Sequence, residues 1–241
     1  MTRHIDFERL HNFRDLGGYR AADGRTVRWG TLFRSDSLAK LKGDDWDRFL
    51  TLGIRTVIDL RYPWEIAAKG RVPDSDGFAY VNLSVEHRPY DQAAIPADLD
   101  PWRYLADRYA EVALDGAKEL RQALELIAAE SGPVVFHCAS GKDRTGLLAA
   151  LVLGLAGVSD DDIAADFALT ELATQRLIAD WQEANPGGTP GWPGYGRAPQ
   201  EVIRLFLADL TTTYGSLASY ATGHLGVDQE LVERLRAQLL D

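Results

Sequence analysis

Residues 133–146 constrain the fold more than any other stretch, because they place the chain's one cysteine between an expected strand and an expected helix. The apolar run at 133–136, PVVF, opens at a Gly-Pro pair and is typical of a buried strand. Residues 146–158 are apolar on nearly every face, as in a core helix. The sequence therefore predicts strand, polar loop and helix, with Cys138 at the strand end and Arg144 at the helix entry.

This arrangement suits phosphate chemistry. A loop that enters a helix N-terminus turns backbone N–H groups inward, and the positive end of the helix dipole adds to their field. Cys138 facing such a loop favours the thiolate, which is the nucleophilic form. Arg144 carries two parallel donors for phosphoryl oxygens, which lysine cannot match. Thr145 is expected to hydrogen-bond the sulfur or steady the loop, and His137 to support it from behind. The expected phosphate-binding residues are Ala139, Ser140, Gly141, Lys142 and Thr145.

Two other interpretations of the loop fit less well. A Walker A nucleotide loop requires G-x-x-x-x-G-K-[ST], but an aspartate follows Gly141-Lys142 and Phe136 stands where the first glycine belongs. A lone buried cysteine is otherwise a small core hydrophobe. The full ten-residue run in a strand-to-helix context favours the chemical role for Cys138.

The run HCASGKDRTG resembles the signature of cysteine-dependent phosphatases of the protein tyrosine phosphatase superfamily. Within it, the chain is similar to the bacterial and fungal tyrosine phosphatase family 3 group, of the atypical dual-specificity type. Further matching motifs, in the family's order, are NFRDLGGY at 12–19, FRSD at 33–36, the segment 53–61 and YGS at 214–216. The resemblance implies one α/β domain over residues 1–241, with a central, mostly parallel sheet flanked by helices. Helices within 159–241 are expected to pack on or cover its core.

The implied enzyme is a metal-independent phosphomonoesterase that needs no cofactor. The Cys138 thiolate attacks phosphorus, while Arg144 and the loop amides hold the spreading charge. An aspartic acid protonates the departing oxygen, and water then hydrolyses the cysteinyl-phosphate intermediate. The expected substrate is phosphotyrosine, with phosphoserine and phosphothreonine as further substrates of a dual-specificity enzyme.

The comparison with the family leaves two aspartates as candidates for the general acid. Asp59 ends an expected buried strand, where ligands bind in open α/β sheets. Asp143 belongs to the phosphate loop itself. Each also has a structural interpretation, a salt bridge to a neighbouring arginine for Asp59 and a loop brace for Asp143. Asp91 or Asp98, in the Pro-, Asp- and Ala-rich segment that precedes the next helix, is a third option.

Other substrates and other classes of protein remain open. Lys142 inside the loop resembles tensin-type lipid phosphatases, and the run Asp143-Arg144-Thr145 resembles myotubularin and Sac inositide phosphatases. Both similarities make phosphoinositides an alternative substrate, although Lys142 also serves simply to raise the potential around phosphate. A catalytically weak phosphate-binding module is an alternative of another class. Rhodanese-like sulfur transfer is disfavoured, because NFRDLGGY does not resemble rhodaneses.

Composition limits the partners of the chain. A net charge of −10 argues against nucleic acid and against anionic membranes. One cysteine rules out an intrachain disulfide and a Cys-based zinc cluster. The N-terminal MTRHIDFERL lacks an apolar signal core, and the longest apolar run is too short to span a bilayer. We therefore expect a cytoplasmic protein acting on a phosphorylated protein or peptide or a phosphoinositide, with export without a signal peptide left open by the resemblance.

The first half of the remaining pattern predicts a hairpin turn at 23–24, a helix over 43–52 closed by Gly53, and strands over 54–60 and 78–83. Two helices separated near 115–116 are expected within 102–129. A helix capped by Ser159 is expected from 159 to about 183, followed by closing helices over 200–213 and 228–240. Trp46, Phe49 and Leu50 are expected on one face of the first helix. Arg14 and Asp15 are expected to form an ion pair under the phosphate loop, with substrate contact by Arg14 as the alternative. Segments 84–100 and 184–199 are expected to be loops, either of which could form a lid.

Overall fold

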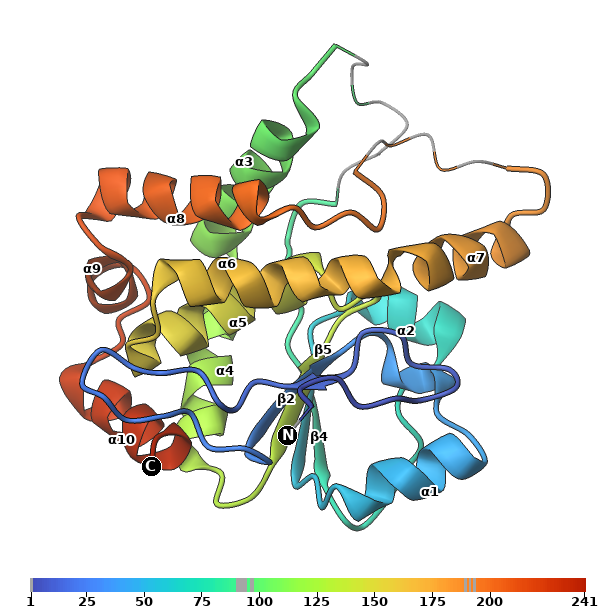
Figure 1. Ribbon diagram of the computed structural model, residues 1–241, viewed down its shortest axis with the longest axis horizontal. Helices are drawn as coiled ribbons and strands as arrows, with labels where there is room; N and C mark the ends of the chain where they lie inside the picture. Colours follow the sequence, from blue (N-terminus) through green and yellow to red (C-terminus); the bar gives the residue numbers. More distant parts are fainter. Residues whose placement is uncertain (1, 90–94, 96–97, 189, 191, 193) are drawn as a thin grey trace.

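The computed structural model describes residues 2–89, 95, 98–188, 190, 192 and 194–241 (Figure 1). Its described residues form a five-stranded sheet in the order β1-β2-β5-β3-β4. The strands are β1 (Arg14–Asp15), β2 (Leu32–Ser35), β3 (Thr56–Asp59), β4 (Ala79–Asn82) and β5 (Val134–His137). Only the pairing of β1 with β2 is antiparallel, and the other three pairings are parallel. The predicted α/β class with a mostly parallel sheet is confirmed.

The central strand β5 is buried on both faces, as its unbroken apolar run predicts. Val134 and Phe136 pack into the larger hydrophobic core, which includes side chains of the helices α4 (Ala117–Ala129), α5 (Asp143–Ala156) and α10 (Gln229–Leu239). Val135 points to the opposite face and packs into a smaller core that includes Phe49 of helix α1 (Asp44–Thr51). Helices therefore cover both faces of the sheet (Figure 1).

Parallel pairing brings three strand ends to one edge of the sheet. His137, the last residue of β5, lies in register with Ser35 of β2 and with Asp59 of β3. The residue after it is Cys138, which therefore emerges where the carboxyl ends of three strands meet. This edge is where open α/β sheets bind ligands.

The helices follow the predicted order with small shifts at their ends. Their bounds are α1 (Asp44–Thr51), α2 (Pro63–Lys69), α3 (Pro101–Asp115), α4 (Ala117–Ala129), α5 (Asp143–Ala156), α6 (Asp160–Ala168), α7 (Thr174–Ala184), α8 (Gln200–Tyr214), α9 (Leu217–Gly223) and α10 (Gln229–Leu239), with short 3-10 turns at Leu38–Lys40 and Leu169–Ala173. The predicted break between α3 and α4 falls at Gly116, where an added Cβ would lie 2.1 Å from the carbonyl oxygen of Val85. The predicted cap is also present, since the Ser159 hydroxyl accepts a hydrogen bond from the Asp162 amide.

The structure differs from the prediction in several places. The helix expected from 159 to 183 is interrupted by the 3-10 turn at Leu169–Ala173, where the buried Thr170 hydroxyl accepts hydrogen bonds from Asn12 and Arg14. Leu50 is 44% exposed and does not share the buried face of α1. Helices α2 and α9 are not among the predicted elements. The hairpin at 23–24 is a turn closed by an isolated antiparallel bridge rather than a pair of strands.

The C-terminal helices pack on the rest of the chain. Helix α10 contacts α4 and α5, and α8 contacts α3 and α6. A single domain over residues 1–241 stays a prediction that these contacts favour. Asp91, together with part of segment 84–100 and part of segment 184–199, lies outside the described residues. Within the described part, no helix is both long enough and apolar enough to cross a membrane, and the cytoplasmic location stays a prediction.

Neighbouring residues of α1 provide a matched test of the smaller core. Phe49 is 1% exposed and packs against Phe13 and Phe78, whereas Leu50 faces solvent. We expect Phe49→Ala to lower the free energy of unfolding by about 3–5 kcal/mol, because it leaves a cavity. Leu50→Ala should change it by about 0.5 kcal/mol or less. Urea unfolding of both variants measures the difference, and equal losses would contradict this account of α1.

Candidate active site

The loop between β5 and α5 is held close to the end of β2. Gly141 has φ of +69°, and a Cβ there would lie 2.5 Å from the carbonyl oxygen of Ser35. A glycine is therefore required at this position by both backbone conformation and space. Among the described residues, no side chain caps the N-terminus of α5. The first N–H groups of this helix remain available to an anion, as its dipole favours.

Groups outside the loop hold its carbonyl oxygens. The Ala139 oxygen accepts from the Ser37 amide at 3.1 Å, and the Ser140 oxygen accepts from Asn12 Nδ2 at 2.9 Å. The Gly141 oxygen accepts from Arg34 Nη2 at 2.8 Å. Because the C=O and N–H of a peptide unit point in opposite directions, outward carbonyls favour inward amides.

A buried carboxylate on α6 holds the arginine that supports the loop. Asp166 Oδ2 accepts from Arg34 Nη1 at 2.6 Å, and its Oδ1 accepts from Arg14 Nε at 3.1 Å. Burial disfavours the charged carboxylate, but the two guanidiniums outweigh burial and lower the pKa of Asp166 to about 2. Arg14 is 1% exposed, so it is a structural residue, as expected. Its expected pairing with Asp15 is wrong, because Asp15 instead accepts from the amides of Gly17 and Gly30.

Cys138 lies at the base of this arrangement and is 1% exposed. Thr145 is fully buried on the first turn of α5, and its hydroxyl has no hydrogen-bond partner among the described residues. His137 is fully buried below the loop, with Nδ1 3.1 Å from the Cys138 carbonyl oxygen. Burial lowers the pKa of His137 more than the nearby Asp59 raises it.

Asp59 is fully buried in an ion pair. Its carboxylate accepts from Arg61 Nε at 2.9 Å and Nη2 at 2.7 Å, and from the Tyr80 hydroxyl at 3.0 Å. Burial raises the pKa of Asp59, but His137 and Arg61 together lower it further than burial raises it. The structure thus shows the salt bridge to a neighbouring arginine that was the alternative to an acid role.

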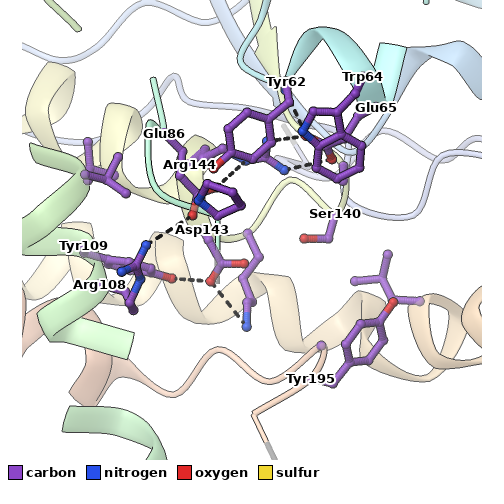
Figure 2. A pocket seen from close by; sticks show the side chains of 17 residues that line it. Tyr62, Trp64, Glu65, Glu86, Arg108, Tyr109, Ser140, Asp143, Arg144 and Tyr195 are labelled. Atoms are coloured by element: carbon purple, nitrogen blue, oxygen red, sulfur yellow. Dashed lines mark hydrogen bonds and ion pairs between the residues drawn. The ribbon is translucent and has the colours of Figure 1, made fainter. Parts of the chain in front are cut away.

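A cavity of about 310 Å³ opens above the loop (Figure 2). Of the predicted site residues, the cavity lining includes Ala139, Ser140, Lys142, Asp143 and Arg144. Four predicted residues do not line the cavity, namely Cys138, Gly141, Thr145 and Asp59. Cys138 and Thr145 are buried beneath the loop surface, and Gly141 lies within the loop. Asp98, the described member of the third pair of acid candidates, is exposed and also lies outside the lining.

Arg144 is fixed in the cavity wall by two glutamates. Nη1 and Nη2 donate to Glu65 at 2.6 and 3.1 Å, and Nε lies 3.8 Å from Glu86 (Figure 2). Burial opposes the charge on Arg144, but Cys138 and the two glutamates outweigh burial and raise its pKa. The guanidinium therefore stays charged and oriented.

Lys142 and Asp143 both face neighbours within the protein. Lys142 is nearly buried, and its Nζ donates to the Gly194 carbonyl oxygen at 3.1 Å. Asp143 Oδ1 accepts from the Tyr109 hydroxyl at 2.7 Å and lies 3.4 Å from Lys142 Nζ. Asp143 therefore braces α3 against the loop while lining the cavity.

Sequence reasoning missed five residues of this site, namely Asn12, Arg34, Glu65, Glu86 and Asp166. Glu65 carries a local signal, because Pro63 is the first residue of α2 and a glutamate at the third helical position can accept from the N-cap amide, as Glu65 does from the Tyr62 N–H at 2.9 Å. Asn12 and Arg34 lie in motifs that the resemblance includes without giving them a role. Glu86 and Asp166 have no such local pattern.

The Asp166 pair predicts a dependence of stability on pH. Asp166→Asn should lower the free energy of unfolding by about 3–5 kcal/mol at pH 7, because it leaves two buried guanidiniums without their counter-charge. The folded pKa of Asp166 is below its ordinary value, so its contribution is full above about pH 4 and is lost as pH falls toward about 2. Free energies of unfolding, measured in urea at several pH values between 3 and 7, should depend less on pH in this variant than in the wild type.

The control for this test lies on the same helix. Asp161 is 81% exposed and pairs with Arg204 at the surface, so Asp161→Asn should cost less than about 1 kcal/mol. An Asp166→Asn loss no larger than that of Asp161→Asn would show that the buried network does not hold the fold.

Comparison with known proteins shows the family to which this chain belongs. A model of the tyrosine phosphatase family matches residues 5–241. A candidate tyrosine-protein phosphatase of Cupriavidus necator is 36% identical over 98% of this chain and 85% of its own length. The triple specificity protein phosphatase PtpB of Mycobacterium tuberculosis is 28% identical over 95% of this chain and 96% of its own.

Among solved structures, a crystal structure of TpbA from P. aeruginosa in complex with pTyr aligns over 88% of each chain, with 14% identity and a TM-score of 0.32. An alignment this loose adds nothing to the account of the site. The family model and the relatives confirm the predicted family and enzyme class. The chain belongs to the tyrosine phosphatase family and is a tyrosine-protein phosphatase, a hydrolase of phosphoric monoesters.

Proposed function

We propose that this phosphatase hydrolyses phosphotyrosine through a cysteinyl-phosphate intermediate on Cys138, without a metal ion. The observation that carries the proposal is the loop 139–141, in which all three carbonyl oxygens are held from outside. Its amides and the N-terminus of α5 then form an anion site above the cysteine. Arg144, held by Glu65, supplies the fixed positive charge for the phosphoryl oxygens.

The reaction has two steps. Cys138 Sγ attacks phosphorus, the S–P bond forms, and the bond to the leaving oxygen breaks as that oxygen takes a proton from a carboxyl group of the cavity. Water then attacks phosphorus, gives a proton to the same carboxylate and displaces the thiolate. Of the two predicted aspartates, only Asp143 lines the cavity. We assign Asp59 to the support of His137 and the β3 end.

Aromatic side chains at the cavity support phosphotyrosine as the substrate. Tyr62 and Trp64 stack with ring centroids 5.3 Å apart, and Trp64 is 62% exposed (Figure 2). Tyr195 lines the cavity from the segment after α7. A tyrosine ring can pack against such faces, whereas a serine side chain cannot. We extend the proposal to phosphoserine and phosphothreonine as further substrates, since the relative PtpB is named for triple specificity.

Phosphoinositides are the weaker alternative because the cavity's cations already face carboxylates. Arg144 pairs with Glu65, Lys142 lies beside Asp143, and Arg108 ion-pairs with Glu111. An inositol polyphosphate needs cations in excess for each added phosphate. The balanced charges favour a monophosphate with an aromatic leaving group.

Phosphate release in EDTA tests this function. Wild-type protein should hydrolyse a phosphotyrosine peptide with a higher kcat/KM than a phosphoserine peptide or a short-chain phosphoinositide. Cys138→Ser should abolish release, because the hydroxyl is not ionised at neutral pH. Arg144→Lys should lower kcat by about 10²–10³, because it keeps the charge and loses the forked donors.

The panel also discriminates among the alternatives. Preferred release from the phosphoinositide would replace the substrate assignment and leave the cysteine mechanism intact. Binding of phosphate without release from any substrate would support the phosphate-binding module. Release that survives in Cys138→Ser would overturn the mechanism.

A further inference from the structure

Glu86 follows β4 and lines the cavity beside the head of Arg144. Its side chain is 12% exposed. Oε2 lies 3.8 Å from Arg144 Nε, and Oε1 lies 3.8 Å from Arg108 Nη2, so Glu86 sits between two guanidiniums (Figure 2). Both distances exceed that of a hydrogen bond, in contrast to the close contacts between Arg144 and Glu65.

The other carboxyl groups of the cavity are engaged as acceptors. Among the described lining residues these are Glu65 and Asp143. Glu65 accepts from two nitrogens of Arg144 and from the Tyr62 amide. Burial raises the pKa of Glu65, but these contacts outweigh burial and lower it, whereas a general acid must carry its proton when substrate binds. Asp143 Oδ1 accepts from the Tyr109 hydroxyl beside Lys142, so this oxygen is turned to neighbours within the protein.

The surroundings of Glu86 raise the pKa of its carboxyl group, whereas those of Glu65 lower it. Burial raises the pKa of Glu86 first, and the negative charge of Asp143 raises it further. Arg144, Arg108 and the nearby Tyr62 hydroxyl lower it, but they are outweighed. A bound phosphate dianion would add another negative charge close by, which raises the pKa of a carboxyl group again.

The position of Glu86 also fits the path of the substrate. Nη1 and Nη2 of Arg144 are committed to Glu65, which leaves Nε as the nitrogen turned toward Glu86. A phosphoryl oxygen bound at Nε would lie close to the Glu86 carboxyl. Proton transfer needs such proximity before it needs a matched pKa.

We propose that Glu86, rather than Asp59 or Asp143, is the general acid of this phosphatase, an inference that rests on the function proposed above. The Glu86 proton passes to the leaving oxygen as the P–O bond breaks and the S–P bond forms. In the second step the Glu86 carboxylate takes a proton from the attacking water, and the S–P bond breaks to restore the Cys138 thiolate. Asp143 is then a positioning residue that braces Tyr109 and Lys142.

A series of aryl phosphates that differ only in the acidity of the departing phenol tests this assignment. Good leaving groups depart without a proton, whereas phenol itself needs one. Glu86→Gln should lower kcat/KM, which reports the first step alone, by about 10²–10⁴ for phenyl phosphate and by less than about tenfold for the most acidic nitrophenols. The fall of kcat/KM for phenyl phosphate at high pH, which reports loss of the acid's proton, should weaken in this variant.

Two variants separate the acid role from a loss of structure. Glu111→Gln removes another carboxylate that pairs with Arg108 and lies outside the cavity lining, so it should leave the leaving-group dependence unchanged. Glu86→Asp keeps an acid on a shorter side chain and should recover part of the loss for phenyl phosphate. Glu86→Gln losses of kcat/KM that are equal across the series, or a leaving-group dependence of kcat/KM that appears in Asp143→Asn or Asp59→Asn instead, would overturn the assignment.

Wild-type protein and Cys138→Ser are measured beside these variants. Wild-type turnover that Cys138→Ser lacks establishes the proposed function independently, so a failure of Glu86 is then a failure of this inference alone. Absence of wild-type turnover on every aryl phosphate would overturn both.

Discussion

The active-site loop depends on one buried carboxylate, Asp166, that lies between two buried arginines. Through Arg34 it fixes the carbonyl of Gly141, and through Arg14 it joins α6 to the N-terminal segment. Three sequence-distant segments therefore meet under the phosphate site. If this contact is broken, the loop loses the partner that orients its amides, so stability and the shape of the site are coupled.

The same network makes the charge below the phosphate site positive. Two guanidiniums and one carboxylate leave one net positive charge buried below the loop, in a chain whose net charge is −10. Burial and the neighbouring Arg14 lower the pKa of Arg34 to about 10, which still leaves it charged at neutral pH. An acidic protein can thus hold a dianionic phosphate because positive charge, helix dipole and amides are concentrated at one point.

Around the loop, carboxylates divide into different roles through their contacts alone. Asp59 and Glu65 hold arginines, and Asp143 accepts from Tyr109. Glu86 lies between two guanidiniums, 3.8 Å from each. Similar chemical groups within one small region therefore differ in what they can do because their hydrogen-bond partners and burial differ.

Local periodicity and contiguous motifs were enough to predict the strand–loop–helix around Cys138, most element boundaries and the family. The sequence by itself could not decide between the aspartates. Asp59 is held in an ion pair because the fold brings Arg61 and Tyr80 beside the end of β3. Glu86 and Asp166 reach the site only through the packing of β4 and α6, since their partners are distant in the chain. Only the tertiary structure sets such long-range contacts, and with them the burial and charge that decide what each carboxyl group can do.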